Sequence, residues 1–439
     1  MTSSGVWRPV QFLGSKLRVI DEVREACIRG IHQSNRVWDA FSGSSVVAQS
    51  VAGASYPVLA TDALAASVVF ARALLGVDRI PGRDPIELAP LVLARADDLV
   101  FGTEWEETLE IERRAIGSGD AETLATLSQS LPQRWRRAGA TGAQQRLFDD
   151  TDTASKAGVA LSRGLLSTTY AGTYFGVTQA VRLEAIRAAV DSLERECLLD
   201  RWEAAVVLTA LSFAASRAVY SAGKHFAQPL RISSTGFHGQ RLLSDRAVDI
   251  DEVFEIGVAN IAGSARPIGE HHLAELAEAQ KVDGGRLSAM GVGTVYADPP
   301  YTAQQYSRFY HLLDVLVDGT PAALQVRAEQ VTSGLYPAER YSSPFCSRTR
   351  AAGAFSALSR NARDANARLV ISYSVSARKS TGNARSIGLE QLLEVIRAEY
   401  GHRNVVVQEL DLRYRQFNSS GLSSPTRDDM EVLIVGEPA

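Results

Sequence analysis

Four consecutive residues in the last third of the chain could act together on an amino group: Asp298, Pro299, Pro300 and Tyr301. They follow a short β-prone run, residues 294–297, so the pattern predicts a strand that stops abruptly at the edge of a sheet. The Asp298 carboxylate accepts hydrogen bonds, and the two prolines have carbonyl oxygens but no N–H, so all three offer acceptors only. Such a cluster suits an amine donor, and the tyrosine ring stands beside it.

Asp-Pro-Pro-Tyr is typical of amino-group methyltransferases, and the longer run 298–314, DPPYTAQQYSRFYHLLD, resembles the Dam-like class of DNA adenine-N6 methyltransferases. The resemblance implies S-adenosyl-L-methionine as cofactor, adenine in double-stranded DNA as substrate, and no metal. Asp298 and a carbonyl of Pro299 or Pro300 would then accept the hydrogens of adenine N6. Tyr301 would stack on the adenine after the base has flipped out of the duplex.

A glycine-containing turn near the N-terminus leads into a run with helical apolar spacing, residues 17–23. The turn contains Gly14, Ser15 and Lys16, and its free N–H groups could attract an anion, although the turn by itself favours a plain helix N-cap. The resemblance implies that Gly14, Lys16 and Trp7 contact the methionine end of the cofactor.

Residues 37–48 read as a strand, a tight Gly/Ser turn and a helix, which is the first crossing of a doubly wound sheet. The Dam-like pattern here is Asp-x-Phe-x-Gly-x-Gly. Asp39, Phe41 and Gly43 match it and are expected to bind the cofactor, whereas Ser45 replaces the last glycine. A side chain at this position is expected to tighten the cofactor pocket.

Two further acids are expected near the cofactor. Residues 56–62 predict the second strand, and Asp62 at its end could accept both ribose hydroxyls or could cap the following helix. Asp283, about 15 residues before Asp298, would contact the cofactor adenine if the resemblance holds, or would form a solvated Asp-Gly turn.

The alternation of strands and helices stops between residues 83 and 282, where helical patterns dominate. We therefore expect an α/β fold with a Rossmann-like methyltransferase sheet and an inserted α-rich target-recognition domain. Residues 1–82 would form the cofactor-binding part and residues 283–439 the catalytic part. The expected helices in the insertion include residues 84–100, 104–131 and 177–198.

Later strands are predicted at residues 367–374, 404–411 and 430–435, and the resemblance implies a closing antiparallel strand. A basic stretch that includes the loop-like segment 230–241 suits contact with DNA phosphates and base edges, with a solvated face as the alternative. The expected DNA contacts are Arg217, Lys224, Arg231, His238 and Arg241, with Arg348 and Arg350 from a proline-containing loop.

The composition is that of a soluble globular protein, with 45% hydrophobic and 22% charged residues among 439. The formal net charge of −4 requires any DNA contact to use a local basic surface. Cys27, Cys197 and Cys346 lack C-x-x-C spacing, which favours neither disulfides nor zinc and fits the cytoplasm. The longest mostly apolar run, residues 204–215, is too short to cross a membrane.

The sequence thus predicts a site-specific DNA adenine-N6 methyltransferase, working alone or with a cognate restriction or phage-defence protein. Two alternatives remain open at this point. The same chemistry could act on cytosine N4 or on an RNA base. Alternatively, the chain could be a non-catalytic DNA-binding subunit of a defence system that retains the fold.

Overall fold

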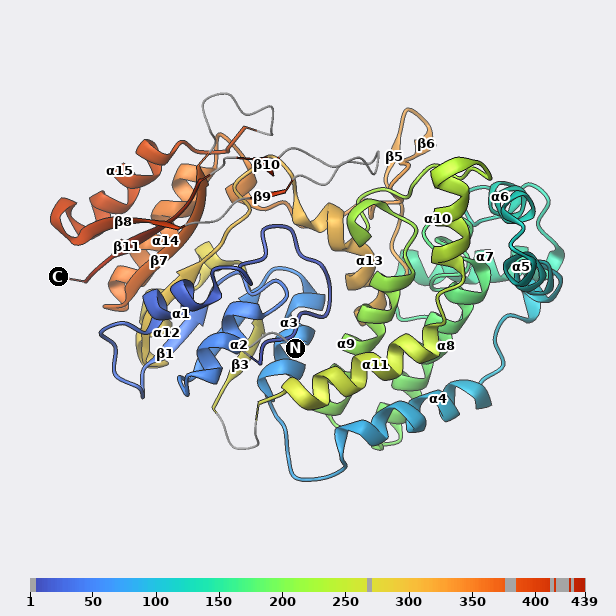
Figure 1. Ribbon diagram of the computed structural model, residues 1–439, viewed down its shortest axis with the longest axis horizontal. Helices are drawn as coiled ribbons and strands as arrows, with labels where there is room; N and C mark the ends of the chain where they lie inside the picture. Colours follow the sequence, from blue (N-terminus) through green and yellow to red (C-terminus); the bar gives the residue numbers. More distant parts are fainter. Residues whose placement is uncertain are drawn as a thin grey trace.

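The computed structural model describes residues 5–266, 271–375, 384–410, 414–415, 426–427 and 430–438. A seven-stranded, mostly parallel sheet with helices on both faces lies at one end, and a group of helices lies at the other (Figure 1). The protein therefore has an α/β architecture.

The strand order of the sheet is β3-β2-β1-β4-β7-β11-β8. The first five strands in this order are parallel, and β11 runs antiparallel to both of its neighbours, β7 and β8. The expected antiparallel strand is thus present, and it lies inside the sheet rather than at its edge. The bounds are β1 Arg36–Asp39, β2 Val58–Asp62, β3 Leu273–Leu276, β4 Val292–Ala297, β7 Arg368–Val375, β8 Val405–Leu410 and β11 Met430–Gly436.

The central strands are buried on both faces, as their nearly continuous apolar sequences require. Because side chains alternate along a strand, Val37 and Trp38 of β1 enter two different apolar clusters. The Val37 cluster is completed by α1 (Ile20–Ile28), α2 (Val46–Gly53) and α3 (Ala65–Leu75). The Trp38 cluster is completed by α12 (Gly284–Ala289), α14 (Ala351–Asp364) and α15 (Leu389–Tyr400).

The helical part shares one apolar core with the sheet part. Phe70 of α3 and Leu316 of α13 belong to the same buried cluster as Ile186 of α8 and Leu211 of α9. None of the helices in the described ranges is both long and apolar enough to span a membrane. The helices are α4 Leu88–Asp98, α5 Glu106–Ser118, α6 Ala121–Ser130, α7 Gly142–Ala157, α8 Val177–Arg195, α9 Arg201–Ala218, α10 Gly236–Arg246, α11 Ile250–Ser264 and α13 Tyr306–Asp318.

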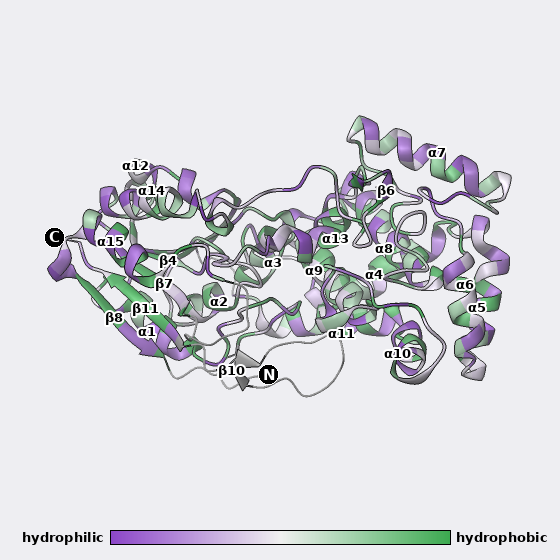
Figure 2. Cartoon of the chain, turned by 90° about the horizontal axis from the view of Figure 1, so that it is seen from above, coloured by the Kyte–Doolittle hydropathy of each residue, from purple (hydrophilic) through white to green (hydrophobic). Residues whose placement is uncertain are grey.

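The helices farthest from the sheet, α5, α6 and α7, carry many hydrophilic side chains (Figure 2). Helix α7 is amphipathic, since its buried residues Leu147, Phe148, Thr151 and Ala154 recur at helical spacing. Its exposed side is therefore polar, as expected for a helix at the surface.

Three sequence-based boundaries need correction. The insertion does not extend to residue 282, because β3 (Leu273–Leu276) pairs with β2 in the main sheet. The expected helix 104–131 is two helices, because Gly119 adopts a left-handed conformation and Asp120 caps α6. The segment 230–241 is not all loop, since α10 begins at Gly236.

Ser45 lies at the start of α2 in a left-handed conformation, with φ 61°. Its side chain is fully buried and its hydroxyl has no hydrogen-bond partner. The Ser45 side chain does not line the pocket described below, so the expected tightening of that pocket does not occur directly. The effect of Ser45 is instead local backbone strain at a position where glycine would be relaxed.

We predict that Ser45→Gly stabilises the protein by about 0.5 to 1 kcal/mol. Relief of left-handed strain is worth about 1 to 2 kcal/mol, and the added freedom of glycine in the unfolded chain offsets about half of it. The matched control is Ser44→Gly, because Ser44 has no positive φ to relieve. In urea unfolding, the free energy of unfolding should therefore rise for Ser45→Gly and fall for Ser44→Gly. Equal destabilisation of the two variants would show that Ser45 is not strained.

Candidate active site

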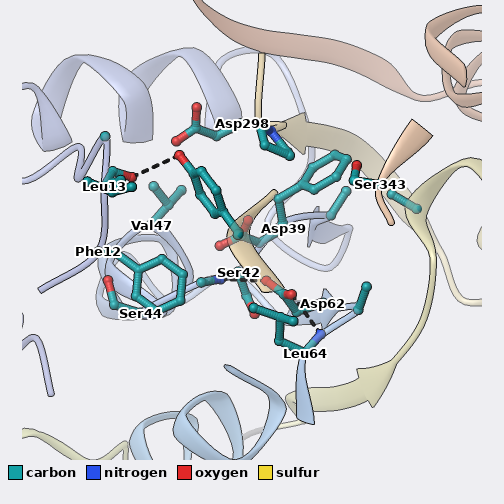
Figure 3. Close-up of a pocket in the computed structure, with 18 of the residues that line it drawn as sticks. Phe12, Leu13, Asp39, Ser42, Ser44, Val47, Asp62, Leu64, Asp298 and Ser343 are labelled. Atoms are coloured by element: carbon teal, nitrogen blue, oxygen red, sulfur yellow. Dashed lines mark hydrogen bonds between the residues drawn. The ribbon is translucent and has the colours of Figure 1, made fainter. Parts of the chain in front are cut away.

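A pocket with about 860 Å³ of space, part of it open to solvent, lies at the carboxyl ends of β1, β2 and β4. The sheet order reverses between β1 and β4, and in open α/β sheets ligands bind at this kind of crevice. Three carboxylates surround the pocket: Asp39, Asp62 and Asp298 (Figure 3). Of the residues expected from the sequence, Gly14, Lys16, Asp39, Phe41, Gly43, Asp62, Asp298 and Pro300 line it.

Asp39 ends β1 and is almost completely buried, and its Oδ1 has no hydrogen-bond partner. Burial, together with the nearby charges of Asp298 and Asp62, raises the pKa of Asp39 to about 8. A buried acceptor with no partner is costly unless a ligand satisfies it. Asp39 is therefore suited to a positively charged or N–H-donating ligand.

Asp62 ends β2 and ties the first Gly/Ser turn to the second strand. Its Oδ2 accepts the Gly43 N–H at 2.9 Å, and its Oδ1 accepts the Leu64 N–H at 3.0 Å. Burial raises the pKa of Asp62 to about 6, and these backbone donors oppose the shift. Each carboxylate oxygen keeps a second acceptor site, so both could still accept hydroxyl groups of a ligand. Asp62 does not cap α3, whose N-cap is Leu64.

The close approach of the backbone to the pocket depends on Gly43. Its φ is 50°, and a Cβ at this position would lie 3.1 Å from Cδ1 of Phe12. Any larger residue would therefore be both strained and crowded, which accounts for glycine here.

Asp298 follows β4 and is bound by a buried lysine. Lys16 Nζ lies 2.9 Å from Asp298 Oδ1, 2.8 Å from Oδ2 and 3.2 Å from Glu431 Oε1, and it donates to the Gly14 carbonyl at 2.9 Å. The Ser372 hydroxyl donates to Glu431 Oε1 at 2.6 Å. One ammonium group is thus shared by two carboxylates from distant segments.

Burial raises the pKa of Asp298 to about 6, Lys16 lowers it, and the charge of Glu431 raises it. The Lys16 and Glu431 side chains are 2% and 0% exposed, whereas Asp298 is 22% exposed and lines the pocket. Sequence reasoning missed Glu431. The signal was a single acid in the apolar strand 430–435, where a charge requires a buried partner.

The Tyr301 ring lies outside the set of residues that line the pocket. It packs edge-on against Tyr373, with ring centroids 5.6 Å apart, and the Arg385 guanidinium lies 4.9 Å from the Tyr301 centroid. Arg385 is fixed by hydrogen bonds to the Ser374 carbonyl and hydroxyl, at 2.7 and 2.9 Å. One face of the Tyr301 ring is therefore occupied by Arg385.

The structure does not bring Trp7 and Asp283 into the pocket. Trp7 packs against Phe213, with ring centroids 5.4 Å apart. Asp283 is exposed, as the alternative expected, but it caps α12 by accepting the Arg286 N–H at 3.0 Å instead of forming an Asp-Gly turn. Residues that line the pocket but were not expected from the sequence include Phe12, Gln305, Tyr306, Tyr341 and Ser343.

The residues expected to contact DNA have different environments. Arg217, Arg231, Arg348 and Arg350 are exposed. His238 is partly buried on α10.

Lys224 and Arg241 both pair with the buried Asp245, at 2.9 and 2.7 Å. Lys224 Nζ also donates to the carbonyls of Arg217 and Val219, which uses all of its N–H groups. Lys224 therefore holds the chain between α9 and α10. No N–H group of its ammonium is left for the expected contact with DNA.

Within the described ranges, no cluster of His, Cys, Asp and Glu side chains could hold a metal ion. Comparisons of the chain with protein-family models, with curated proteins and with solved structures found no match.

Proposed function

We propose that the protein is an S-adenosyl-L-methionine-dependent methyltransferase that acts on adenine N6 in DNA. The observation that carries the proposal is the position of Asp298, which lines the same pocket as Asp39 and Asp62, the acids that end β1 and β2. The Asp-Pro-Pro-Tyr resemblance supports the amine substrate. The strand order, with β11 inserted antiparallel, supports the sheet that the resemblance implies.

The pocket residues fit the proposed cofactor. Asp62 at the tip of β2 is placed to accept ribose hydroxyls, and the unpartnered Asp39 Oδ1 is suited to a positive group. Gly43 brings the backbone close to the pocket. When bound, S-adenosyl-L-methionine would supply an electrophilic methyl group on a positively charged sulfur.

The residues of the chain would prepare the amine. The lone pair of adenine N6 is conjugated with the ring, so N6 is a poor nucleophile until its hydrogens are held by acceptors. The Asp298 carboxylate would accept one hydrogen, and Lys16 would keep that carboxylate ionised. The carbonyl of Pro299 or Pro300 would accept the other hydrogen. Pro300 lines the pocket, and its carbonyl keeps a second acceptor site beside the Cys346 thiol, whose Sγ lies 3.7 Å from the oxygen. Catalysis would then be positioning and electrostatic stabilisation, with no covalent enzyme intermediate.

We predict that Asp298→Asn lowers the rate of methyl transfer to duplex DNA by about 100-fold to 1,000-fold, because the amide cannot accept the amine hydrogen as strongly. Asp283→Ala is the matched control, since Asp283 is exposed and outside the pocket. Initial rates with radiolabelled cofactor measure the effect. An unchanged rate for Asp298→Asn in a folded protein would refute the mechanism.

The pH dependence of the rate should report the ionisation of Asp298. The carboxylate must be ionised to accept the amine hydrogen, so the rate should fall as the pH falls through about 6, the pKa of Asp298. The charge of Glu431 raises this pKa, so Glu431→Gln should lower it. The fall in rate on the acidic side of the pH–rate profile should then move to lower pH. Glu437→Gln is the control, because Glu437 pairs with Arg368 at the other end of β11. An unchanged pH–rate profile for Glu431→Gln would contradict the effect of the Glu431 charge on the pKa of Asp298.

Binding of the cofactor should release a proton from Asp39. The pKa of Asp39 is raised to about 8, so the carboxyl carries a proton at neutral pH and must lose it to pair with a positive ligand. Affinity for S-adenosyl-L-methionine should therefore increase between about pH 6 and 8, approaching about tenfold per pH unit. Calorimetric titrations in buffers of different ionisation enthalpy measure the proton, and Asp39→Asn should bind without releasing it. Binding without proton release by the unchanged protein would contradict this role.

A further inference from the structure

Two arginines from different segments contact the same tyrosine ring. Arg308 lies in the first turn of α13, and Arg340 lies in the loop that follows Tyr336. Each guanidinium carbon is 5.0 Å from the centroid of the Tyr336 ring. The Tyr336 hydroxyl accepts a hydrogen bond from Arg308 Nη2 at 3.0 Å and donates one to the Ala227 carbonyl. The Arg308 guanidinium is therefore held by a hydrogen bond and by the ring, and that of Arg340 by the ring contact.

A third arginine, Arg327, lies in the hairpin of β5 (Val326–Arg327) and β6 (Gln330–Val331), which projects beyond α13 (Figure 1). Burial lowers the pKa of Arg340, and the positive charges of Arg308 and Arg327 lower it further. Arg340 is thus repelled by both of the other arginines.

Two arginines of the helical part show a contrasting arrangement, because each is paired with two carboxylates. Arg137 pairs with Asp149 and Asp152, and Arg182 pairs with Asp97 and Asp251.

In the part of the chain that the structure describes, no carboxylate forms an ion pair with Arg308, Arg327 or Arg340, and the buried Nε of Arg340 has no partner. Glu329 and Glu339, the nearest acids along the chain, are exposed. The arginines around the Tyr336 ring thus have no neutralising carboxylate within the described ranges, and one buried N–H donor is unused. This arrangement indicates a site for an anion.

The segments that carry Arg308 and Arg340 adjoin the pocket. Arg308 follows Ser307, and Arg340 precedes Tyr341, and both Ser307 and Tyr341 line the pocket. The Ser307 hydroxyl donates to the Tyr341 carbonyl at 2.7 Å, which joins the two segments. The main chain of both arginines is therefore one residue away from the pocket lining.

We propose that Arg308, Arg327 and Arg340 bind backbone phosphates of the DNA strand whose adenine enters the pocket. This inference rests on the proposed function. Guanidinium groups match phosphate oxygens by paired N–H donors, and stacking on an aromatic ring fixes their direction. An extruded nucleotide needs its flanking phosphates held, because phosphate contacts set the position of the strand while the base is read elsewhere.

The test compares Arg308→Gln/Arg340→Gln with Arg113→Gln/Arg114→Gln. The control pair removes the same number of charges from the exposed surface of α5, where both arginines pair with Glu110. Fluorescence anisotropy with a labelled duplex oligonucleotide, at several salt concentrations, gives the affinity and its salt dependence. The first variant should bind about 10-fold to 100-fold more weakly, with a slope of log K against log salt reduced by about 1 to 2, whereas the control should match the unchanged protein.

Arg327→Gln is a second variant that is safe for folding, because Arg327 is exposed in a hairpin. Arg327→Gln should reduce the slope of log K against log salt by about 1. Equal affinity and slope for all variants would overturn the phosphate site, and so would absence of duplex binding by the unchanged protein.

The failure of the proposed function is distinguishable from the failure of this site. Loss of binding in the arginine variants supports the site even if the unchanged protein transfers no methyl group. Conversely, normal methylation and normal DNA binding by the arginine variants would leave the proposed function intact and refute the phosphate site.

Discussion

The arrangement of the pocket depends on one buried ammonium group, that of Lys16, which joins Asp298 and Glu431. The three residues come from the N-terminal loop, the end of β4 and the start of β11, and Lys16 and Asp298 are 282 positions apart. Removing these charges from water costs several kcal/mol per ion, and close pairing offsets that cost only while every partner is in place. Loss of one partner would leave a buried charge uncompensated, so the N-terminal loop, β4 and β11 must be assembled together.

The parallel sheet explains why acids distant in sequence surround one pocket. Asp39, Asp62 and Asp298 each follow or end a parallel strand, and the carboxyl ends of parallel strands meet at the same edge. Burial raises the pKa values of all three carboxyl groups, and repulsion from neighbouring carboxylates adds to the shift for Asp39 and Asp298. In the proposed function, a positively charged methyl donor would relieve this repulsion.

The sequence predicted most of the strands and the acids that end them, because apolar runs and the turn residues after them are local signals. The strand predicted at residues 367–374 is β7, displaced by one residue. The short strand β3 was missed, since its sequence Leu-Ala-Glu-Leu has no β-branched residue and its place at the sheet edge depends on pairing with β2. The role of Glu431 could not be read from local sequence either, because its partner Lys16 is brought close only by the folded chain.

The helical region shares its core with α3 and α13, so it is packed onto the sheet part rather than tethered to it. Helix α13 contributes to this core, to the pocket through Ser307, and to the arginine cluster through Arg308. In the proposed function, DNA held by the arginine cluster would therefore be held rigidly relative to Asp298.

The most direct test of the central claim is to identify the nucleoside that receives the methyl group. Duplex DNA of mixed sequence would be incubated with the protein and with S-adenosyl-L-methionine labelled in the methyl group, digested to nucleosides and analysed by mass spectrometry. The account predicts label in N6-methyladenine. Label only in a methylated cytosine, or no labelled nucleoside at all, would contradict it.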